Sequence, residues 1–248
     1  MTGLSSQTYR IPLLDEIISS PDLRPLFQPI VDLHAGNGPA IFGFEALARF
    51  RSGNPILDPE FLFLYAGRKN RTCDLDVACL ERSLRHGSDL LPARLFVNIH
   101  PTMLMEAARW IHLIELYPSL AGRLVLEVTE QGALDQQVLT TNVFSRLRDL
   151  GVELALDDVG IAYSHLALID RIRPRYIKIS HLFGTGFEQD PTKEKIIRNV
   201  MGLAADFGCR VVLEGIETRA TADAATSLGI ALGQGYFYSR PQEAATFR

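Results

Sequence analysis

The sequence predicts an α/β protein built as a TIM-type (β/α)8 barrel with one antiparallel strand near the N-terminus. Short apolar runs recur along the chain, and most of them are followed by a segment with helical periodicity. The runs are rich in Leu, Val and Ile on both faces, which is typical of a buried parallel sheet. About eight such runs within 248 residues match the length of a closed barrel.

The predicted strands lie at 27–33, 42–50, 95–99, 124–129, 154–159, 176–179, 211–216 and 236–238. The first two are separated only by a short loop at 35–39, which contains Gly36, Asn37, Gly38 and Pro39. These residue types favour a hairpin rather than a helical crossover. We therefore expect the first pair of strands to be antiparallel and the others to be parallel.

The predicted helices lie at 74–90, 102–116, 136–150, 163–171, 192–207 and 218–228. Asp190-Pro191 opens one of them, since a proline in the first helical turn loses no hydrogen bond. Gly151 and Gly208 follow two predicted helices, as expected for C-terminal caps. No linker interrupts this pattern, so we expect an N-terminal extension at 1–20 and one domain at 21–248.

Composition narrows the class of protein. The net charge of −4 argues against a duplex nucleic-acid binder, which usually has a strongly basic face. Three cysteines without metal-type spacing indicate reduced thiols. The first residues do not resemble a signal peptide, and no apolar run approaches the roughly 20 residues of a membrane helix. We therefore expect a cytoplasmic domain without a membrane segment.

Polar residues stand within or at the ends of the apolar runs. They are Glu45, Asn98, Glu127, Asp157, Asp158, Lys178 and Glu214. In a barrel, the C-terminal ends of the strands meet at one mouth, where catalytic residues lie. The sequence therefore predicts that these side chains converge.

Several buried carboxylates need nearby cations. Lys178 and Arg49 are the obvious local ones, which are too few for five acids. The acids and Asn98 offer only oxygen ligands, which favours Mg²⁺ or Mn²⁺ over Zn²⁺. The adjacent Asp157 and Asp158 could serve two ions, and two ions about 3.5–4 Å apart suit displacement at phosphorus.

Each residue also has a purely structural interpretation. Asn98 could be a satisfied core amide, Asp157-Asp158 could form a turn before Gly160, and Lys178 could lie at a sheet edge. We favour the metal site because these interpretations would all have to hold at successive strand ends.

The ordered series of motifs resembles the EAL-domain family of cyclic di-GMP phosphodiesterases. The resemblance extends from about residue 27 to residue 241. It rests on FQPIV at 27–31, FEALAR at 44–49, VNI at 97–99, LEVTE at 126–130, LDDVG at 156–160, IKI at 177–179, LEGIE at 213–217 and GQGY at 233–236.

The resemblance implies a metal-dependent hydrolysis of cyclic di-GMP to linear pGpG, with two Mg²⁺ or Mn²⁺ ions. It implies roles for residues of this sequence. Glu45, Asn98, Glu127 and Asp157 would hold the first ion, and Asp157 and Asp158 the second. Glu214 would act on the attacking water, as general base or through the second ion, and Lys178 would orient the water or the scissile phosphate. Substrate contacts would come from Gln28, Leu47, Arg49 and Gln234, and Glu130 would steady the loop after Asp158.

The sequence departs from the family pattern at several positions. Ser180 stands where the family commonly has Asp, Gly67 replaces a common Glu and His100 a common Ser. The loop at 159–165 lacks the usual Phe-Gly-Thr-Gly-Tyr-Ser-Ser. These departures leave open a degenerate receptor that binds cyclic di-GMP without cleaving it, or a protein-interaction module. We favour an active enzyme because all proposed metal ligands are present, and the resemblance also implies a homodimer.

Overall fold

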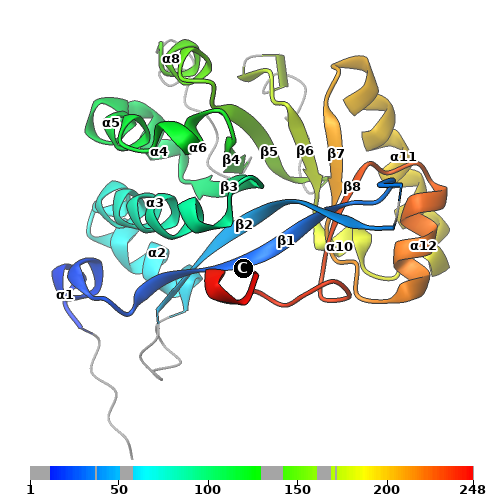
Figure 1. The fold of residues 1–248 in the computed structure, drawn as a ribbon, viewed down its shortest axis with the longest axis horizontal. Helices are drawn as coiled ribbons and strands as arrows, with labels where there is room; N and C mark the ends of the chain where they lie inside the picture. The colour runs from blue at the N-terminus through cyan, green and yellow to red at the C-terminus, as the bar shows by residue number, and fades with distance from the viewer. Residues whose placement is uncertain are drawn as a thin grey trace, which may run out of the picture.

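The computed structural model describes residues 12–36, 38–50, 58–129, 142–160, 169, 170 and 172–247. Within these residues, strands β1 to β8 form a closed barrel in sequence order (Figure 1). β1 (Leu23–Asp32) pairs antiparallel with β2 (Ala40–Phe50) and with β8 (Leu232–Gln234). The remaining neighbours are parallel, and they are β3 (Arg94–Ile99), β4 (Leu124–Thr129), β5 (Glu153–Val159), β6 (Tyr176–Ile179) and β7 (Arg210–Leu213). The predicted barrel and its antiparallel hairpin are confirmed.

Helices surround the barrel (Figure 1). The longer ones follow the predicted pattern, and they are α3 (Thr72–Gly87), α8 (Val143–Asp149), α11 (Pro191–Asp206) and α12 (Arg219–Ser227). The predicted helix at 163–171 falls largely outside the described residues. None of the described helices combines the length and apolar character needed to span a bilayer.

Four of the described helices were not predicted, and they are α1 (Leu14–Ser19), α2 (Pro59–Arg68), α6 (Pro118–Ala121) and α10 (His181–Gly184). The Asp58 side chain accepts a hydrogen bond from the backbone N–H of Phe61, and Pro59 lies in the first turn of α2. This is the same start signal as at Asp190-Pro191, so α2 could have been found from the sequence.

The predicted single helix at 102–116 is wrong. The chain forms α4 (Pro101–Met105), a 3₁₀ turn at Ala107–Arg109 and α5 (Ile111–Glu115). The indole of Trp110 is fully buried, and its Nε1–H donates to the carbonyl oxygen of Met103 at 2.8 Å. The helix breaks because this large side chain is inserted into the core between its two halves.

The predicted strand at 236–238 is also wrong, because the last strand lies at Leu232–Gln234 and a turn follows it. A Cβ on Gly235 would lie only 2.0 Å from the carbonyl oxygen of Ile216. The two segments therefore cross at a distance that only glycine permits. The Phe237 N–H donates to the same carbonyl oxygen at 3.0 Å, which fixes the turn after the strand.

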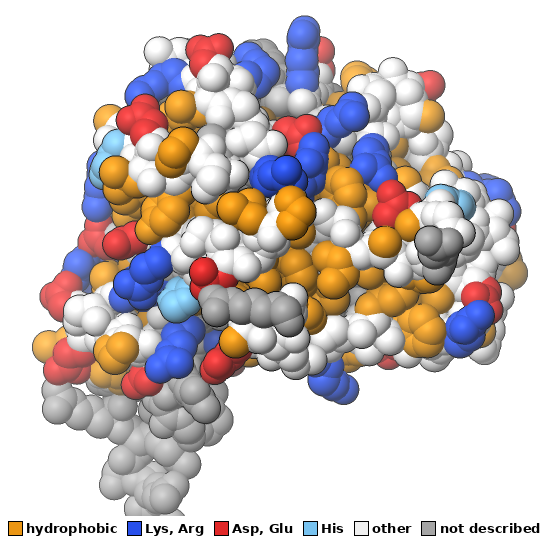
Figure 2. Space-filling model, in the orientation of Figure 1, with side chains coloured by type: hydrophobic (Ala, Val, Ile, Leu, Met, Phe, Trp, Pro, Cys, Tyr) orange, Lys and Arg blue, Asp and Glu red, His pale blue; other side chains and the backbone are white. Residues whose placement is uncertain are grey.

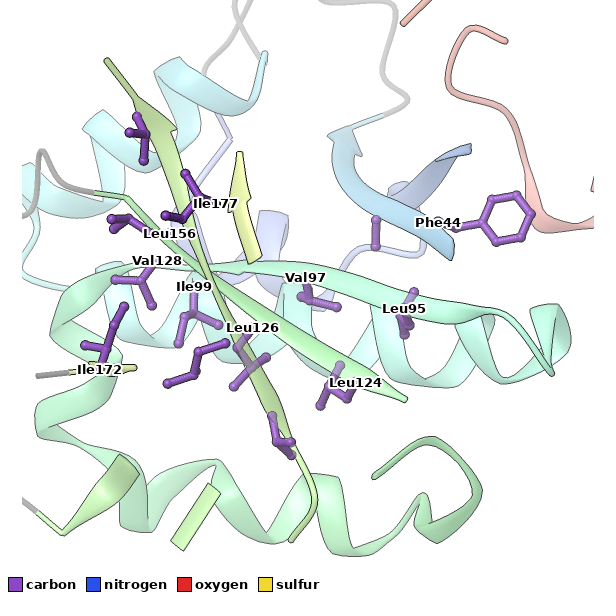
Figure 3. Packing of buried hydrophobic residues seen from close by; sticks show 14 of the residues in the cluster. Phe44, Leu95, Val97, Ile99, Leu124, Leu126, Val128, Leu156, Ile172 and Ile177 are labelled. Atoms are coloured by element: carbon purple, nitrogen blue, oxygen red, sulfur yellow. The ribbon is translucent and has the colours of Figure 1, made fainter. Parts of the chain in front are cut away.

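The core has an outer part made of two clusters and an inner part made of one cluster inside the barrel. The outer part lies between strands and helices, where Figure 3 shows alternate residues of β3 and β4, including Leu95, Val97, Leu124 and Leu126, on the side that faces the helices. The inner part is a smaller cluster made of Ile30, Phe96, Val125, Ala155, Tyr176, Val212 and Leu232. Burial of these side chains is the main stabilising contribution to such a fold.

Candidate active site

The inner cluster positions the polar residues of the mouth. Successive side chains of a strand alternate between the two faces, so residues two apart share a face and lie about 6–7 Å apart. Phe96 and Val125 belong to the inner cluster, and two residues later stand Asn98 and Glu127. The same spacing relates Ala155 to Asp157, Tyr176 to Lys178, Val212 to Glu214 and Leu232 to Gln234. A layer of polar residues therefore stands on a layer of apolar ones.

Lys178 is the centre of the polar layer and is 1% exposed. Its Nζ lies 2.9 Å from Glu127 Oε1 and 2.9 Å from Glu214 Oε1. It also lies 3.3 Å from Asp157 Oδ1 and 3.5 Å from Glu45 Oε2. Burial alone would lower the pKa of this ammonium, but the surrounding carboxylates outweigh burial and hold the pKa well above its usual value.

Glu45 on β2 is linked to three neighbouring amides. Asn98 Nδ2 donates to Glu45 Oε1 at 2.8 Å, and Gln234 Nε2 donates to Glu45 Oε2 at 2.6 Å. The Gln234 amide also donates to Gln28 Oε1 at 3.1 Å, because Gln28 lies opposite Glu45 in the antiparallel pair. Asn98 uses its nitrogen here, so its amide oxygen is left for another partner.

Asp157 and Asp158 are adjacent, yet both line the same cavity. The pairing of β5 with β6 shifts register between Leu156 and Val159, and Asp158 has a φ of +56°. A left-handed residue at this shift turns the second carboxylate toward the mouth instead of the helices, and Asp adopts this conformation more readily than most residues. Oxygens of Asp157, Asp158 and Glu214 lie within 4.8 Å of one another.

A cavity of about 410 Å³ opens at this end of the barrel. It is lined by Gln28, Glu45, Leu47, Asp157, Asp158, His181, Glu214, Gly215, Glu217, Gln234, Gly235 and Tyr236. A second cavity of about 270 Å³ adjoins it, since Leu47 belongs to both linings. Arg49 and Asn98 face the second cavity, and Arg49 Nη1 donates to the carbonyl oxygen of Ala48 at 2.8 Å.

The acids of the mouth are short of positive charge. Burial raises the pKa of Glu127 well above its usual value and raises that of Glu214 to about 8. Burial raises the pKa of Asp157 as well. Burial also acts on Glu45, but Lys178 and the amide hydrogen bonds outweigh it and lower the pKa of this carboxyl. One lysine therefore does not offset the cost of burying Glu127, Asp157 and Glu214 as charged groups.

The donor set fits divalent cations. Glu127 is fully buried, and its Oε2 has no hydrogen-bond partner among the described residues. A buried carboxylate oxygen without a partner is costly unless a cation completes its contacts. The ligand atoms present are carboxylate and amide oxygens, which Mg²⁺ and Mn²⁺ prefer. The residues are therefore suited to hold such ions.

The structure brings together most of the predicted site residues. Glu130 and residues 161–165 of the loop after Asp158 lie outside the described residues. Ser180 is fully buried, and its Oγ has no hydrogen-bond partner in the described part of the chain. Ser180 therefore does not supply the carboxylate that the family pattern commonly has at this position.

The sequence analysis missed two candidate functional residues. Asp76 lies on α3, is 2% exposed and lines the second cavity, where its Oδ2 accepts the backbone N–H of His100 at 2.6 Å. It could have been found as the one acid on the buried helix face that includes Cys79 and Leu80. His181 lines the first cavity, but it follows the strand end by two residues and no motif marks it.

Comparisons with known proteins agree with this geometry. The family model described as EAL domain matches residues 13–241. A cyclic di-GMP phosphodiesterase of Vibrio parahaemolyticus, TpdA, is 28% identical over 199 residues, which are 79% of this chain and 33% of that protein. The chain spans 28% to 57% of the length of eight curated relatives that it matches, six of which are named as cyclic di-GMP phosphodiesterases or probable ones.

Solved structures share the fold. A PaMucR phosphodiesterase in complex with c-di-GMP has a TM-score of 0.83 at 23% identity, with 95% of this chain and 98% of that chain covered. Klebsiella pneumoniae BlrP1 in complex with calcium and cyclic di-GMP has a TM-score of 0.76 at 26% identity, with 95% and 59% covered. Both likenesses extend over the whole barrel described above.

Proposed function

The chain belongs to the EAL domain family, and from this premise we propose that it is a metal-dependent phosphodiesterase that hydrolyses cyclic di-GMP to linear pGpG. The observation that carries the proposal is the set of four carboxylates around one buried lysine, three of which, those of Glu45, Asp157 and Glu214, line a cavity large enough for a nucleotide. The matched relatives named as cyclic di-GMP phosphodiesterases support the choice of substrate.

We propose that Glu45, Asn98, Glu127 and Asp157 hold one Mg²⁺ or Mn²⁺ ion and that Asp157 and Asp158 hold a second. When bound, the ions would supply an activated water and neutralise charge on the phosphate. Glu214, which has a carboxylate oxygen within 4.8 Å of oxygens of Asp157 and Asp158, would act on the attacking water, as the general base that accepts its proton or through the second ion. Lys178 would hold these carboxylates in place and stabilise charge that develops on the phosphate oxygens.

We propose substrate contacts in both of the cavities that meet at Leu47. Gln28 and Gln234 face the larger cavity, whereas Arg49 faces the smaller one. A cyclic dinucleotide has two bases and two phosphates, so the two adjoining cavities could each take one half. Arg49 would contact a phosphate, and the buried Asp76 could accept hydrogen bonds from a guanine edge.

The test is incubation of the purified protein with cyclic di-GMP and Mn²⁺ or Mg²⁺, followed by chromatography of the nucleotides. We expect pGpG to appear and to disappear when the metal is chelated. Binding of cyclic di-GMP without pGpG would instead show a degenerate receptor, which the buried Ser180 in place of a common Asp would explain. Absence of binding in a calorimetric titration would indicate a protein-interaction module.

Other properties follow from the family and stay predictions. Cys73, Cys79 and Cys209 are free thiols, which supports a reducing cytoplasmic setting. A homodimer is expected, and sedimentation of the protein at micromolar concentration would test it. We also propose the domain limits 21–248, which limited proteolysis can examine.

A further inference from the structure

His181 occupies a fixed position at the edge of the catalytic cavity. It is the first residue of α10 (His181–Gly184) and comes three residues after Lys178. A Cβ on Gly215 would lie 3.0 Å from both the Cα and the carbonyl oxygen of His181. The start of α10 is therefore packed against the segment that directly follows Glu214, so the histidine has a defined place relative to that carboxylate.

The imidazole of His181 is available for a ligand. His181 is exposed and lines the same cavity as Asp158 and Glu214. Its ring makes no hydrogen bond or ion pair with any described residue. Among the described residues of that lining, His181 is the only one with a basic side chain. Lys178 cannot substitute for it, because its ammonium is buried and already contacts four carboxylates.

The difference in burial between the groups around the cavity indicates a role for His181. In-line displacement at phosphorus places the attacking and leaving oxygens on opposite sides of the phosphorus atom. Glu127 and Lys178 are fully buried, and Oε1 of the proposed base Glu214 lies 2.9 Å from the Lys178 Nζ, so we take this buried end as the floor, where the attacking water belongs. The leaving oxygen then points away from the floor toward the exposed edge, where His181 stands. A ribose 3′-oxygen is a poor leaving group as an alkoxide, so a proton donor at this edge would accelerate its departure.

We propose that His181 is the general acid that protonates the leaving ribose 3′-oxygen, an inference that rests on the proposed phosphodiesterase function. As the bond between the water oxygen and phosphorus forms, the proton of that water passes to Glu214. The bond between phosphorus and the 3′-oxygen breaks, and the imidazolium of His181 gives its proton to that oxygen. Exchange with solvent returns a proton to His181 and removes one from Glu214, so the sum of the steps is the addition of one water.

The test compares two substrates with different leaving groups. Cyclic di-GMP releases a ribose oxygen that needs a proton, whereas bis(p-nitrophenyl) phosphate releases a phenolate that does not. We expect His181→Asn to lower kcat for cyclic di-GMP by about 100-fold or more, within the usual range for general acid catalysis. Hydrolysis of bis(p-nitrophenyl) phosphate should change less than about threefold by the same reasoning. His112→Asn, an exposed histidine on α5, is the matched control and should alter neither reaction.

Other outcomes overturn the proposal. Equal losses with both substrates would show that His181 supports the metal site or the fold, and an increase in KM alone would show that it only binds substrate. Unchanged rates would remove it from the mechanism. Unfolding temperature, and the affinity for cyclic di-GMP measured in a Glu214→Gln background, should not change with His181→Asn. If the wild-type protein itself releases no pGpG, the proposed function fails, and that result is distinct from failure of the histidine variant.

Discussion

The two layers inside the barrel have opposite electrostatic character, although they are built by the same strands. At the base, Tyr176 accepts a hydrogen bond from Arg94 Nε at 2.8 Å and donates to Glu153 Oε2 at 3.0 Å, while Arg94 also pairs with Glu153 at 3.2 Å. Two residues later on the same strand, Lys178 faces four carboxylates. The base neutralises its charges one to one, whereas the mouth keeps an excess of negative charge.

This difference indicates which end the fold uses for stability and which for chemistry. Residues at the N-terminal end of barrel strands generally serve stability, and those at the C-terminal end serve catalysis. At the base, Arg94 and Arg210 also lie over the ring of Phe42, with guanidinium carbons 5.4 and 4.6 Å from its centroid. Figure 2 shows a face of the molecule on which hydrophobic side chains gather at the centre with basic side chains beside them. Variants at the base should therefore change mainly stability, and variants at the mouth should change mainly catalysis.

The largest expected effect is loss of catalysis at the mouth. Glu45→Ala removes a proposed ligand and should lower kcat for cyclic di-GMP by at least about 1,000-fold at saturating Mg²⁺, since metal ions supply several kcal/mol of transition-state stabilisation. The measurement is pGpG release by chromatography. Glu81→Ala, at an exposed position on α3, is the control and should retain full activity. Retained turnover in Glu45→Ala would refute its assigned role.

The second effect concerns stability without metal. Lys178→Met leaves four buried carboxylates without their cation and should lower the free energy of unfolding by about 3–5 kcal/mol at neutral pH. Arg94→Met at the base removes a partly exposed partner and should cost only about 1 kcal/mol. Urea unfolding in the presence of a chelator measures both. Equal losses would contradict the contrast between the layers.

The third effect is a pH dependence of the free energy of unfolding that arises at Asp76, near the mouth. Burial raises the pKa of Asp76 to about 7, from an unfolded value of 3.8. Between these values the folded protein retains a proton that the unfolded chain releases, so stability falls as pH rises from about 4 to 7, by a few kcal/mol in total. Asp76→Asn keeps an oxygen for the His100 N–H and should remove this dependence. Urea unfolding at pH 5 and pH 8 measures it, and an unchanged slope in the variant would contradict the assignment.

A smaller effect is expected at the base. Tyr176→Phe removes two hydrogen bonds, to Arg94 and Glu153, and should lower the free energy of unfolding by about 1–2 kcal/mol. Because the ring is retained, kcat for cyclic di-GMP should not change. A loss of activity larger than the loss of stability explains would show that the base layer positions the mouth.

The smallest expected effect is an increase in kcat caused by a substitution at the mouth. Ser180→Asp restores the carboxylate that the family commonly has, at a buried position whose hydroxyl makes no hydrogen bond to a described residue. We expect kcat to rise a few-fold, which is about 1 kcal/mol or less of the barrier. Steady-state kinetics with Mn²⁺ measure it, and Ser180→Asn is the uncharged control. No change would show that the common Asp is dispensable in this chain.

The strand pattern and the polar residues at strand ends were sufficient to predict the barrel and its mouth. Each apolar run of β3 to β7 was found because buried parallel strands carry apolar residues on both faces. Asp76 and His181 were missed because both lie on helices, whose residues reach the cavities only through tertiary packing. The break at Trp110 was missed because local periodicity does not reveal that an indole must enter the core. The roles of the individual site residues stay predictions until variants are measured.

The pairing of β1 with β8 has a consequence for how the protein folds. Gln28 and Gln234, which are joined by a hydrogen bond, are 206 residues apart in the chain, so they meet only after nearly all of it has been synthesised. Contacts between such distant residues form slowly, because a long loop must close first. The proposed substrate contacts across this seam are therefore assembled late, even though Glu45, Asn98 and Glu127 can already be neighbours in an unclosed sheet. A partly folded chain would hold most of the acidic residues in place before it acquires the ability to recognise a nucleotide.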